Sequence, residues 1–186
     1  EGKLLWPEGG VSLRHVGHQI AGDGLGGAVL LVHEGRHLYG TDPRITGQCI
    51  LYVERLDSKG HLPWLEEPLL ITEKGQLLQG VITGDGSGGA VIAWRTWEHT
   101  SNWKGKVSAQ KLDAEGKPLW REKGIAVFTA LELKYQGYPK VVSDGSGGAI
   151  VLAVVGEKPS RGDTVYAQRL DAKGNALWGD GVKISP

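Results

Sequence analysis

The sequence predicts an all-β, β-propeller-like fold: three four-stranded antiparallel blades of about 58 residues each, in an incomplete ring. Three observations predict it. The motif Asp-Gly-x-Gly-Gly-Ala occurs three times, beginning at Asp23, Asp85 and Asp144. A second motif, Leu-Asp-x-x-Gly, follows each copy, and a tryptophan follows each second motif, at Trp64, Trp120 and Trp178. Trp6 belongs to the same series, and the intervals between the four tryptophans are 58, 56 and 58 residues.

Each repeat is expected to begin with a β-hairpin. The first strand precedes the Asp-Gly turn, as at 79–83 and 139–143. Because glycine accepts positive φ without strain, Asp-Gly favours a tight turn, in which Gly27, Gly89 and Gly148 are structural residues. The second strand is the apolar run that follows, at 29–32, 91–94 and 150–155, and its β-branched residues favour a buried strand over a helix.

Two more strands complete each repeat. The third strand ends at the Leu-Asp of the second motif, and the fourth is expected in the short stretch that carries the tryptophan. A blade cannot bury both faces alone, so blades stack and the recurrent tryptophan packs between neighbours. We therefore divide the single repeat domain into a leading Trp strand (1–10), three blades (11–64, 65–120 and 121–178) and the start of a further unit (179–186).

The number of blades predicts that the ring is incomplete. Propellers typically need about four to eight blades to close. The chain has three copies of the first three strands but four Trp strands. We expect either part of a longer chain, flanked by further blades, or a subunit that completes its ring with another copy. End-to-end association through the leading and trailing Trp strands is a further alternative.

The repeat is similar to two known patterns. The run Leu-Asp-x-x-Gly-x-x-Leu-Trp at 112–120 and 170–178 resembles the tryptophan-docking motif of pyrroloquinoline-quinone-type propellers. The whole unit resembles an uncharacterised tandem repeat of secreted and cell-surface bacterial proteins. Blade 3 matches that repeat best, through Val165–Asp171, and blade 1 departs from it, with Leu25 in place of serine. The resemblance implies the fold and an extracellular or cell-surface location, but no activity.

The composition excludes several classes of function. The 186 residues include 21 basic and 21 acidic side chains, and zero net charge argues against nucleic-acid binding. A single cysteine excludes an internal disulfide framework and a cysteine-based zinc cluster. No run approaches eighteen apolar residues, so we expect no membrane insertion.

We expect no catalytic residue, no cofactor and no metal site. The run 84–89 is similar to the Gly-Asp-Ser-Gly-Gly of trypsin-type proteases, but no histidine stands at a matching place in the repeat to activate a serine. The Asp-Gly loops are candidate Ca²⁺ sites, although one carboxylate per loop is few for a cation that takes about six to eight oxygen ligands. Capping of its own turn by Asp85 or Asp144 is the simpler interpretation.

The candidate ligand-binding residues lie in the loops between the second and third strands, which vary while the strands repeat. Loops on a rigid scaffold commonly carry function. Exposed aromatic rings with nearby polar groups suit sugar stacking or a protein hot spot. The candidates are Tyr39, Arg95, Trp97, His99 and Trp103. The alternative is that Trp97 or Trp103 only covers its own loop.

Three functions follow from these observations. The first is a non-catalytic extracellular scaffold for binding or assembly, with another copy or flanking blades as its partner. The second is a carbohydrate-binding propeller that uses Tyr39, Trp97 and Trp103. The third is a fragment of a propeller hydrolase, which would need two converging carboxylates, for which Glu34, Asp42 and Glu98 are the loop acids available.

Overall fold

The protein is all-β. The structure is a computed structural model that describes residues 6, 10–13, 17–34, 50–64, 69–71, 76–97, 105–129, 135–156 and 164–185. These residues form strands and turns and contain no α-helix, so none of them forms a helix long and apolar enough to cross a membrane. The prediction of an all-β chain with antiparallel sheets is confirmed.

The strands form three four-stranded antiparallel sheets, each built from consecutive strands. Sheet 1 contains β1 (Gly17–Gly22), β2 (Ala28–Glu34), β3 (Ile50–Leu56) and β4 (Leu69–Ile71). Sheet 2 contains β5 (Gln76–Gly84), β6 (Ala90–Trp97), β7 (Gly105–Leu112) and β8 (Ile125–Ala126). Sheet 3 contains β9 (Tyr135–Ser143), β10 (Ala149–Gly156), β11 (Thr164–Leu170) and β12 (Val182–Lys183).

The position of the fourth strand differs from the prediction. It lies after the tryptophan and not at it: β8 follows Trp120, for example, and pairs with β7. The stretch before the tryptophan makes only a short contact with the third strand, where Leu119 N–H donates to the carbonyl of Lys111 at 2.7 Å. The tryptophan lies in a turn, from which the ring of Trp120 extends to the next sheet, and Gly124, at φ 78°, turns the chain back. Each sheet therefore runs past the boundary that we predicted at 64, 120 or 178.

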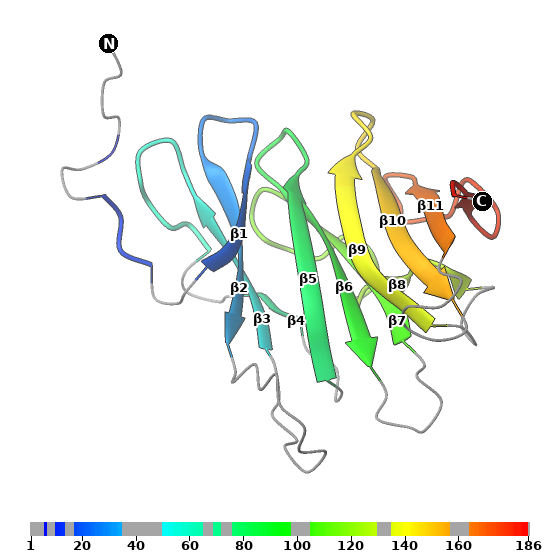
Figure 1. Cartoon of the computed structure of the whole chain (residues 1–186). Coiled ribbons are helices and arrows are strands. Elements are labelled where there is room, and N and C mark those ends of the chain that lie inside the picture. The colour runs from blue at the N-terminus through cyan, green and yellow to red at the C-terminus, as the bar shows by residue number, and fades with distance from the viewer. Residues whose placement is uncertain are drawn as a thin grey trace, which may run out of the picture.

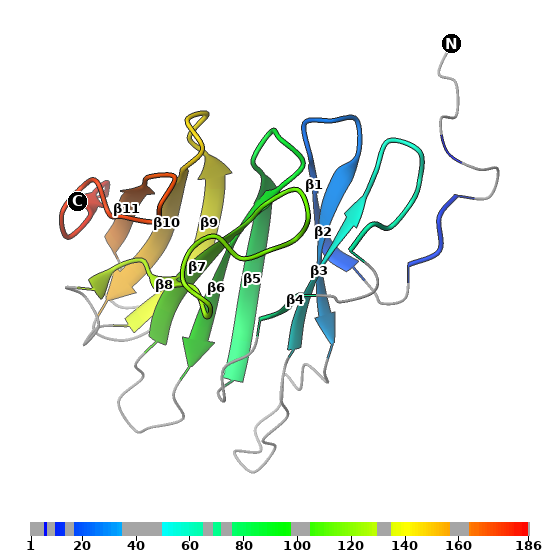
Figure 2. The same ribbon diagram turned by 180° about the vertical axis from the view of Figure 1, so that it is seen from behind.

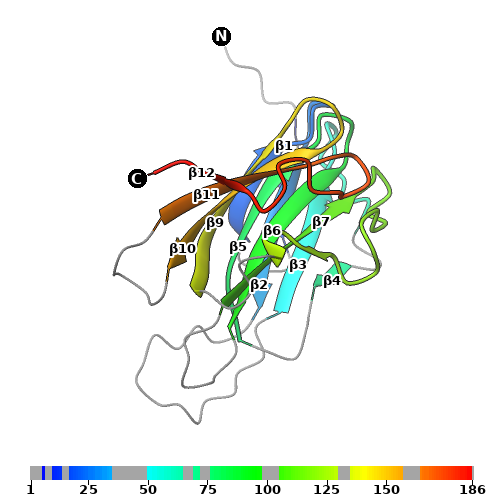
Figure 3. The ribbon, with the colours of Figure 1, turned by 90° about the vertical axis from the view of Figure 1, so that its right-hand side faces the viewer.

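The three sheets lie side by side in chain order (Figures 1 and 2). The turns between first and second strands, at 23–27, 85–89 and 144–148, gather at one end of the sheets, which is the top of Figures 1 and 3. There the turns of sheets 1 and 2 touch, since Gly88 N–H donates to the carbonyl of Asp23 at 3.0 Å.

Each sheet has an exit face, toward the next sheet, and an entry face, toward the preceding one. The exit face of sheet 1 and the entry face of sheet 2 meet in one buried cluster, which includes Val29, Leu31, Val53, Ile82, Ile92 and Trp94. The exit face of sheet 2 and the entry face of sheet 3 meet in another, which includes Val91, Ala93, Ala109, Val141, Val151 and Ala153. Sheet 2 is therefore apolar on both faces, as expected for a strand run buried on two sides.

Candidate functional site

The first turn of each sheet is capped by the carboxylate of its aspartate. In sheet 1, Oδ1 of Asp23 accepts hydrogen bonds from the backbone N–H groups of Leu25 and Gly27, both at 2.8 Å. Asp85 and Asp144 accept the equivalent bonds in sheets 2 and 3. One oxygen of each carboxylate is thus committed to its own turn, the use that the Asp-Gly sequence predicts.

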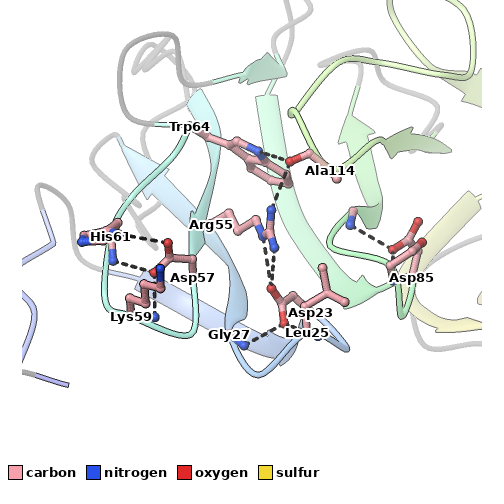
Figure 4. Close-up of polar contacts among 12 residues, drawn as sticks. Asp23, Leu25, Gly27, Arg55, Asp57, Lys59, His61, Trp64, Asp85 and Ala114 are labelled. Carbon is pink, nitrogen blue, oxygen red and sulfur yellow. Dashed lines mark hydrogen bonds and ion pairs between the residues drawn. The ribbon is translucent and has the colours of Figure 1, made fainter. Parts of the chain in front are cut away.

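The second oxygen of each carboxylate faces a cation from the end of the third strand. Asp23, which has no exposed surface, accepts from Nε and Nη2 of Arg55 at 3.1 and 3.0 Å (Figure 4). Charge-assisted pairs with two donors are strong and fix geometry. The equivalent pairs are Lys111 with Asp85 at 3.5 Å and Arg169 with Asp144 at 2.8 Å.

These contacts lower the pKa values of the three aspartates. Burial raises the pKa of the Asp23 carboxyl, but the N–H groups of Leu25 and Gly27 and the guanidinium of Arg55 together outweigh burial and hold that pKa below its usual value. The pKa values of Asp85 and Asp144 are lowered in the same way, against the same opposing effect of burial. All three carboxylates are therefore ionised at neutral pH.

Acid should unfold the chain by protonating these three carboxylates. Aspartate in an unfolded chain has a pKa of about 3.9, and the folded values lie lower. Their contribution to stability is therefore complete above that pH and is lost as the pH falls through the folded values. We expect the urea midpoint to fall steeply below about pH 4, and to fall less in Asp23→Asn, which has one carboxylate fewer. An equal midpoint at neutral pH and at about pH 3 would contradict this account.

One tryptophan joins each of the first two sheets to the sheet that follows it. Nε1 of Trp64 donates to the carbonyl of Ala114 in sheet 2 at 2.9 Å (Figure 4), and Nε1 of Trp120 donates to the carbonyl of Ala172 in sheet 3 at 3.0 Å. Both rings are buried. The acceptor in each case is the main chain of the Leu-Asp-x-x-Gly turn of the following sheet. The second motif of one repeat is thus the receptor for the tryptophan of the repeat before it.

The receiving turn requires its glycine. Gly116 and Gly174 have φ values of 81° and 82°. A Cβ atom on Gly116 would lie 3.1 Å from the ring of Trp64, and one on Gly174 would lie 2.9 Å from the ring of Trp120. The glycine therefore supplies the left-handed backbone and also leaves room for the indole to approach.

Two glutamines that are not among the predicted site residues hold the turns that contain Trp120 and Trp178 in place. Oε1 of Gln110 accepts from the N–H of Trp120 at 2.8 Å, and its Nε2 donates to the carbonyl of Arg121 at 2.7 Å. Gln168 makes the equivalent bonds to Trp178 and to the residue that follows it. The signal in the sequence is a polar residue two positions before the leucine of Leu-Asp, within an otherwise largely buried strand.

The exit face of sheet 3 meets no further sheet in the part of the chain that the structure describes. Trp178, at the position of Trp64 and Trp120, is 37% exposed. Val142 and Val182 on this face are also exposed. Four other apolar residues of the face are half-buried, namely Ile150, Leu152, Val154 and Val165, and Ala167 is buried. An apolar sheet face of this kind commonly marks a site of interaction.

The entry face of sheet 1 is covered differently. Trp6, Val11 and Leu13 pack against a buried cluster of Leu30, Val32 and Leu56. This leading segment covers the second and third strands, while Ile20 on the first strand remains 67% exposed. The entry face is therefore covered over its second and third strands and open at Ile20 on its first strand.

The structure places the predicted ligand-binding residues only in part. Arg95 lies in β6 and is 5% exposed, so its side chain belongs to the interior and not to a loop surface. Trp97 is the last residue of β6, and its side chain is outside the description, as are Tyr39, His99 and Trp103. Binding by these aromatics stays a prediction. Among the described residues, no three histidine, cysteine, aspartate or glutamate side chains form a group that could hold a metal ion.

Comparisons with known proteins found structural similarity but no family. No family model matches the chain, and no curated protein matches it. Among solved structures, the chain is similar to an endo-arabinase from Bacteroides thetaiotaomicron VPI-5482, with a TM-score of 0.43 and 17% sequence identity. The match covers 87% of this chain and 57% of that one, so the chain spans little more than half the length of this neighbour.

Proposed function

We propose that the chain is a non-catalytic scaffold of β-propeller blades that acts by assembly, with sheets 1, 2 and 3 as consecutive blades. Its exit face on sheet 3 binds a further protein module of the same ring. A location outside the cell or at its surface is proposed with it, from the resemblance of the repeat to secreted and cell-surface bacterial proteins.

One observation carries this proposal: the contacts that join the sheets recur, and sheet 3 presents the same groups with no following sheet among the residues that the structure describes. Trp64 and Trp120 each donate to the next sheet, whereas Trp178 is exposed at the equivalent position. The described polar side chains that repeat between sheets cap turns or join strands. The repeated polar residues thus hold the turns and strands of each sheet in place, which is the role of a scaffold.

Solution mass tests the proposal. We expect the mass, measured by light scattering after size exclusion, to rise above the 19.9 kDa of one chain as concentration increases. Val142→Asp should keep the chain at 19.9 kDa, because a charge on the exit face cannot be buried unpaired. Val142 is 55% exposed, so this change should leave folding intact. A wild-type chain that stays at the mass of one copy at every concentration contradicts assembly through this face.

A further inference from the structure

The exit face of sheet 3 contains residues whose equivalents are buried in the other two sheets. Ile150 corresponds to Val29 and Val91, which are both fully buried between sheets. Leu152 corresponds in the same way to Leu31 and Ala93. The two internal interfaces show what the equivalent faces of sheets 1 and 2 pack against: the entry face of the next sheet, together with a turn that receives an indole.

Sheet 1 of this chain carries a further copy of that receiving turn. Oδ1 of Asp57 accepts from the N–H groups of Lys59 and His61 at 2.8 and 2.9 Å, and Gly60 has φ 86°. The turns that receive Trp64 and Trp120 have the same two bonds, made by Asp113 and Asp171, and the same left-handed glycine. The receptor on sheet 1 is thus fully formed.

The first strand of sheet 1, β1, also matches the first strand of sheet 2, β5, on the entry face. Ile20 pairs with Leu30, as Ile82 pairs with Ile92 in sheet 2, so cross-strand neighbours share this face. Ile82 is 7% exposed because sheet 1 covers it, whereas Ile20 is 67% exposed. An apolar side chain that is buried at one interface is therefore presented to solvent at its equivalent position.

The leading segment occupies the place of an incoming tryptophan strand. In sequence, Trp6, Val11 and Leu13 correspond to Trp120, Ile125 and Val127, which pack on sheet 3. The leading segment packs on sheet 1 in the same manner. In sheet 3 the corresponding residues are Trp178, Val182 and Ile184, all exposed. Two segments of one chain thus fit the same receptor, and only one of them is seated.

From these observations we infer that the exit face of sheet 3 binds the entry face of sheet 1 of a second copy, where Trp178 displaces Trp6 of that copy. The inference rests on the proposed function and names its partner. The contact is head to tail, and an interface of this kind closes into a ring when its rotation permits. Two copies would bring six blades together, within the range of about four to eight that closed propellers have.

Two surface variants and their mixture test this arrangement. Ile20→Lys blocks the entry face and Val142→Asp blocks the exit face, and both residues are exposed in the single chain. Light scattering should show each variant at 19.9 kDa and the wild type at twice that mass at high concentration. An equimolar mixture should recover the doubled mass, because the intact exit face of one variant meets the intact entry face of the other.

The outcomes separate this inference from the proposed function. If Ile20→Lys still assembles while Val142→Asp does not, two exit faces meet each other; the head-to-tail inference is then overturned and assembly through sheet 3 stands. If the mixture of two monomeric variants stays at the mass of one copy, the head-to-tail inference is also overturned. If the wild type never exceeds the mass of one copy, both are overturned.

Competition between the two tryptophans gives a second readout. Trp6→Ala weakens the segment that covers the entry face, so assembly should shift to lower protein concentration. Trp178→Ala removes the incoming ring and should shift it to higher concentration or abolish it. Weaker assembly after Trp6→Ala would overturn the displacement, because Trp6 would then be part of the contact and not its competitor.

Discussion

Trp120→Ala is expected to lower the free energy of unfolding by about 3–5 kcal/mol, the range for truncation of a buried large aromatic residue. The ring of Trp120 is 1% exposed, and it packs in the cluster between sheets 2 and 3. Its Nε1 donates to the carbonyl of Ala172, which would be left without this donor. Truncation therefore opens a cavity and removes the hydrogen bond that joins the two sheets.

Trp178→Ala is the matched control. Trp178 occupies the same place in the repeat, and its backbone N–H donates to Gln168 as that of Trp120 donates to Gln110. Trp178 is 37% exposed and docks on no sheet among the described residues, so truncation should lower the free energy of unfolding by clearly less than Trp120→Ala does. Both variants are compared by urea unfolding at a concentration where the wild type has the mass of one chain. Equal losses in the two variants would show that docking on a following sheet does not set the contribution of the ring.

Trp120→Phe separates the ring from its hydrogen bond. Phenylalanine retains most of the apolar packing but has no N–H to donate to Ala172. The loss should be smaller than for alanine and close to the net contribution of one hydrogen bond, about 0.5–1.5 kcal/mol. A loss as large as that of Trp120→Ala would assign the whole effect to the hydrogen bond.

Gly84→Ala should destabilise the contact between sheets 1 and 2 by about 3 kcal/mol, the upper end of the range for overpacking. A Cβ atom at this position would lie 1.9 Å from the carbonyl oxygen of Gly22, which no rotamer change can relieve. The clash is with the main chain, so the two sheets must separate at this end. The measurement is again the urea midpoint, with the slope recorded to detect loss of cooperativity.

Gly22→Ala is the control for that substitution, since Gly22 holds the equivalent place before the first turn of sheet 1. A Cβ atom there would meet nothing within 4 Å, and the backbone is not left-handed. We expect no loss, and a gain of up to about 1 kcal/mol from the reduced entropy of the unfolded chain. In sheet 3 this place holds Ser143, in keeping with an open position. If Gly22→Ala lost as much stability as Gly84→Ala, intrinsic strand preference and not the close approach would be the cause.

The first three strands of each sheet could be predicted because local rules specify them. Asp-Gly turns and apolar runs mark the hairpins, and β3, β7 and β11 end at the leucine of Leu-Asp as expected. The fourth strands could not be placed, because β8 and β12 have two residues each and too few side chains to show alternation. Their position is set by pairing with the third strand, which is a contact between segments distant in the sequence and not a local pattern.

The sequence predicts the residues of the contacts between sheets but not the atoms that they contact, for a similar reason. The recurrence of Trp64 and Trp120 predicts that they pack between repeats, but not which atom accepts their N–H groups. The acceptor is a main-chain carbonyl, and because every residue has one, the sequence does not indicate which carbonyl accepts. The exposed face of sheet 3 could not be told from the buried face of sheet 2, because both have the same apolar composition. Only the presence or absence of a neighbour separates them.

Among the described residues, the main contacts between sheets join neighbours in the chain, and this has a consequence for how the molecule opens. The stability of the protein is then approximately a sum over the three sheets, in which each sheet contributes its own stability and an interface term with each neighbouring sheet. The middle unit is coupled twice and the terminal units once. Thermal fluctuations should therefore release the third unit before the second, and the chain would fray from its open end inward. Any partner that caps that end would slow this fraying throughout the array.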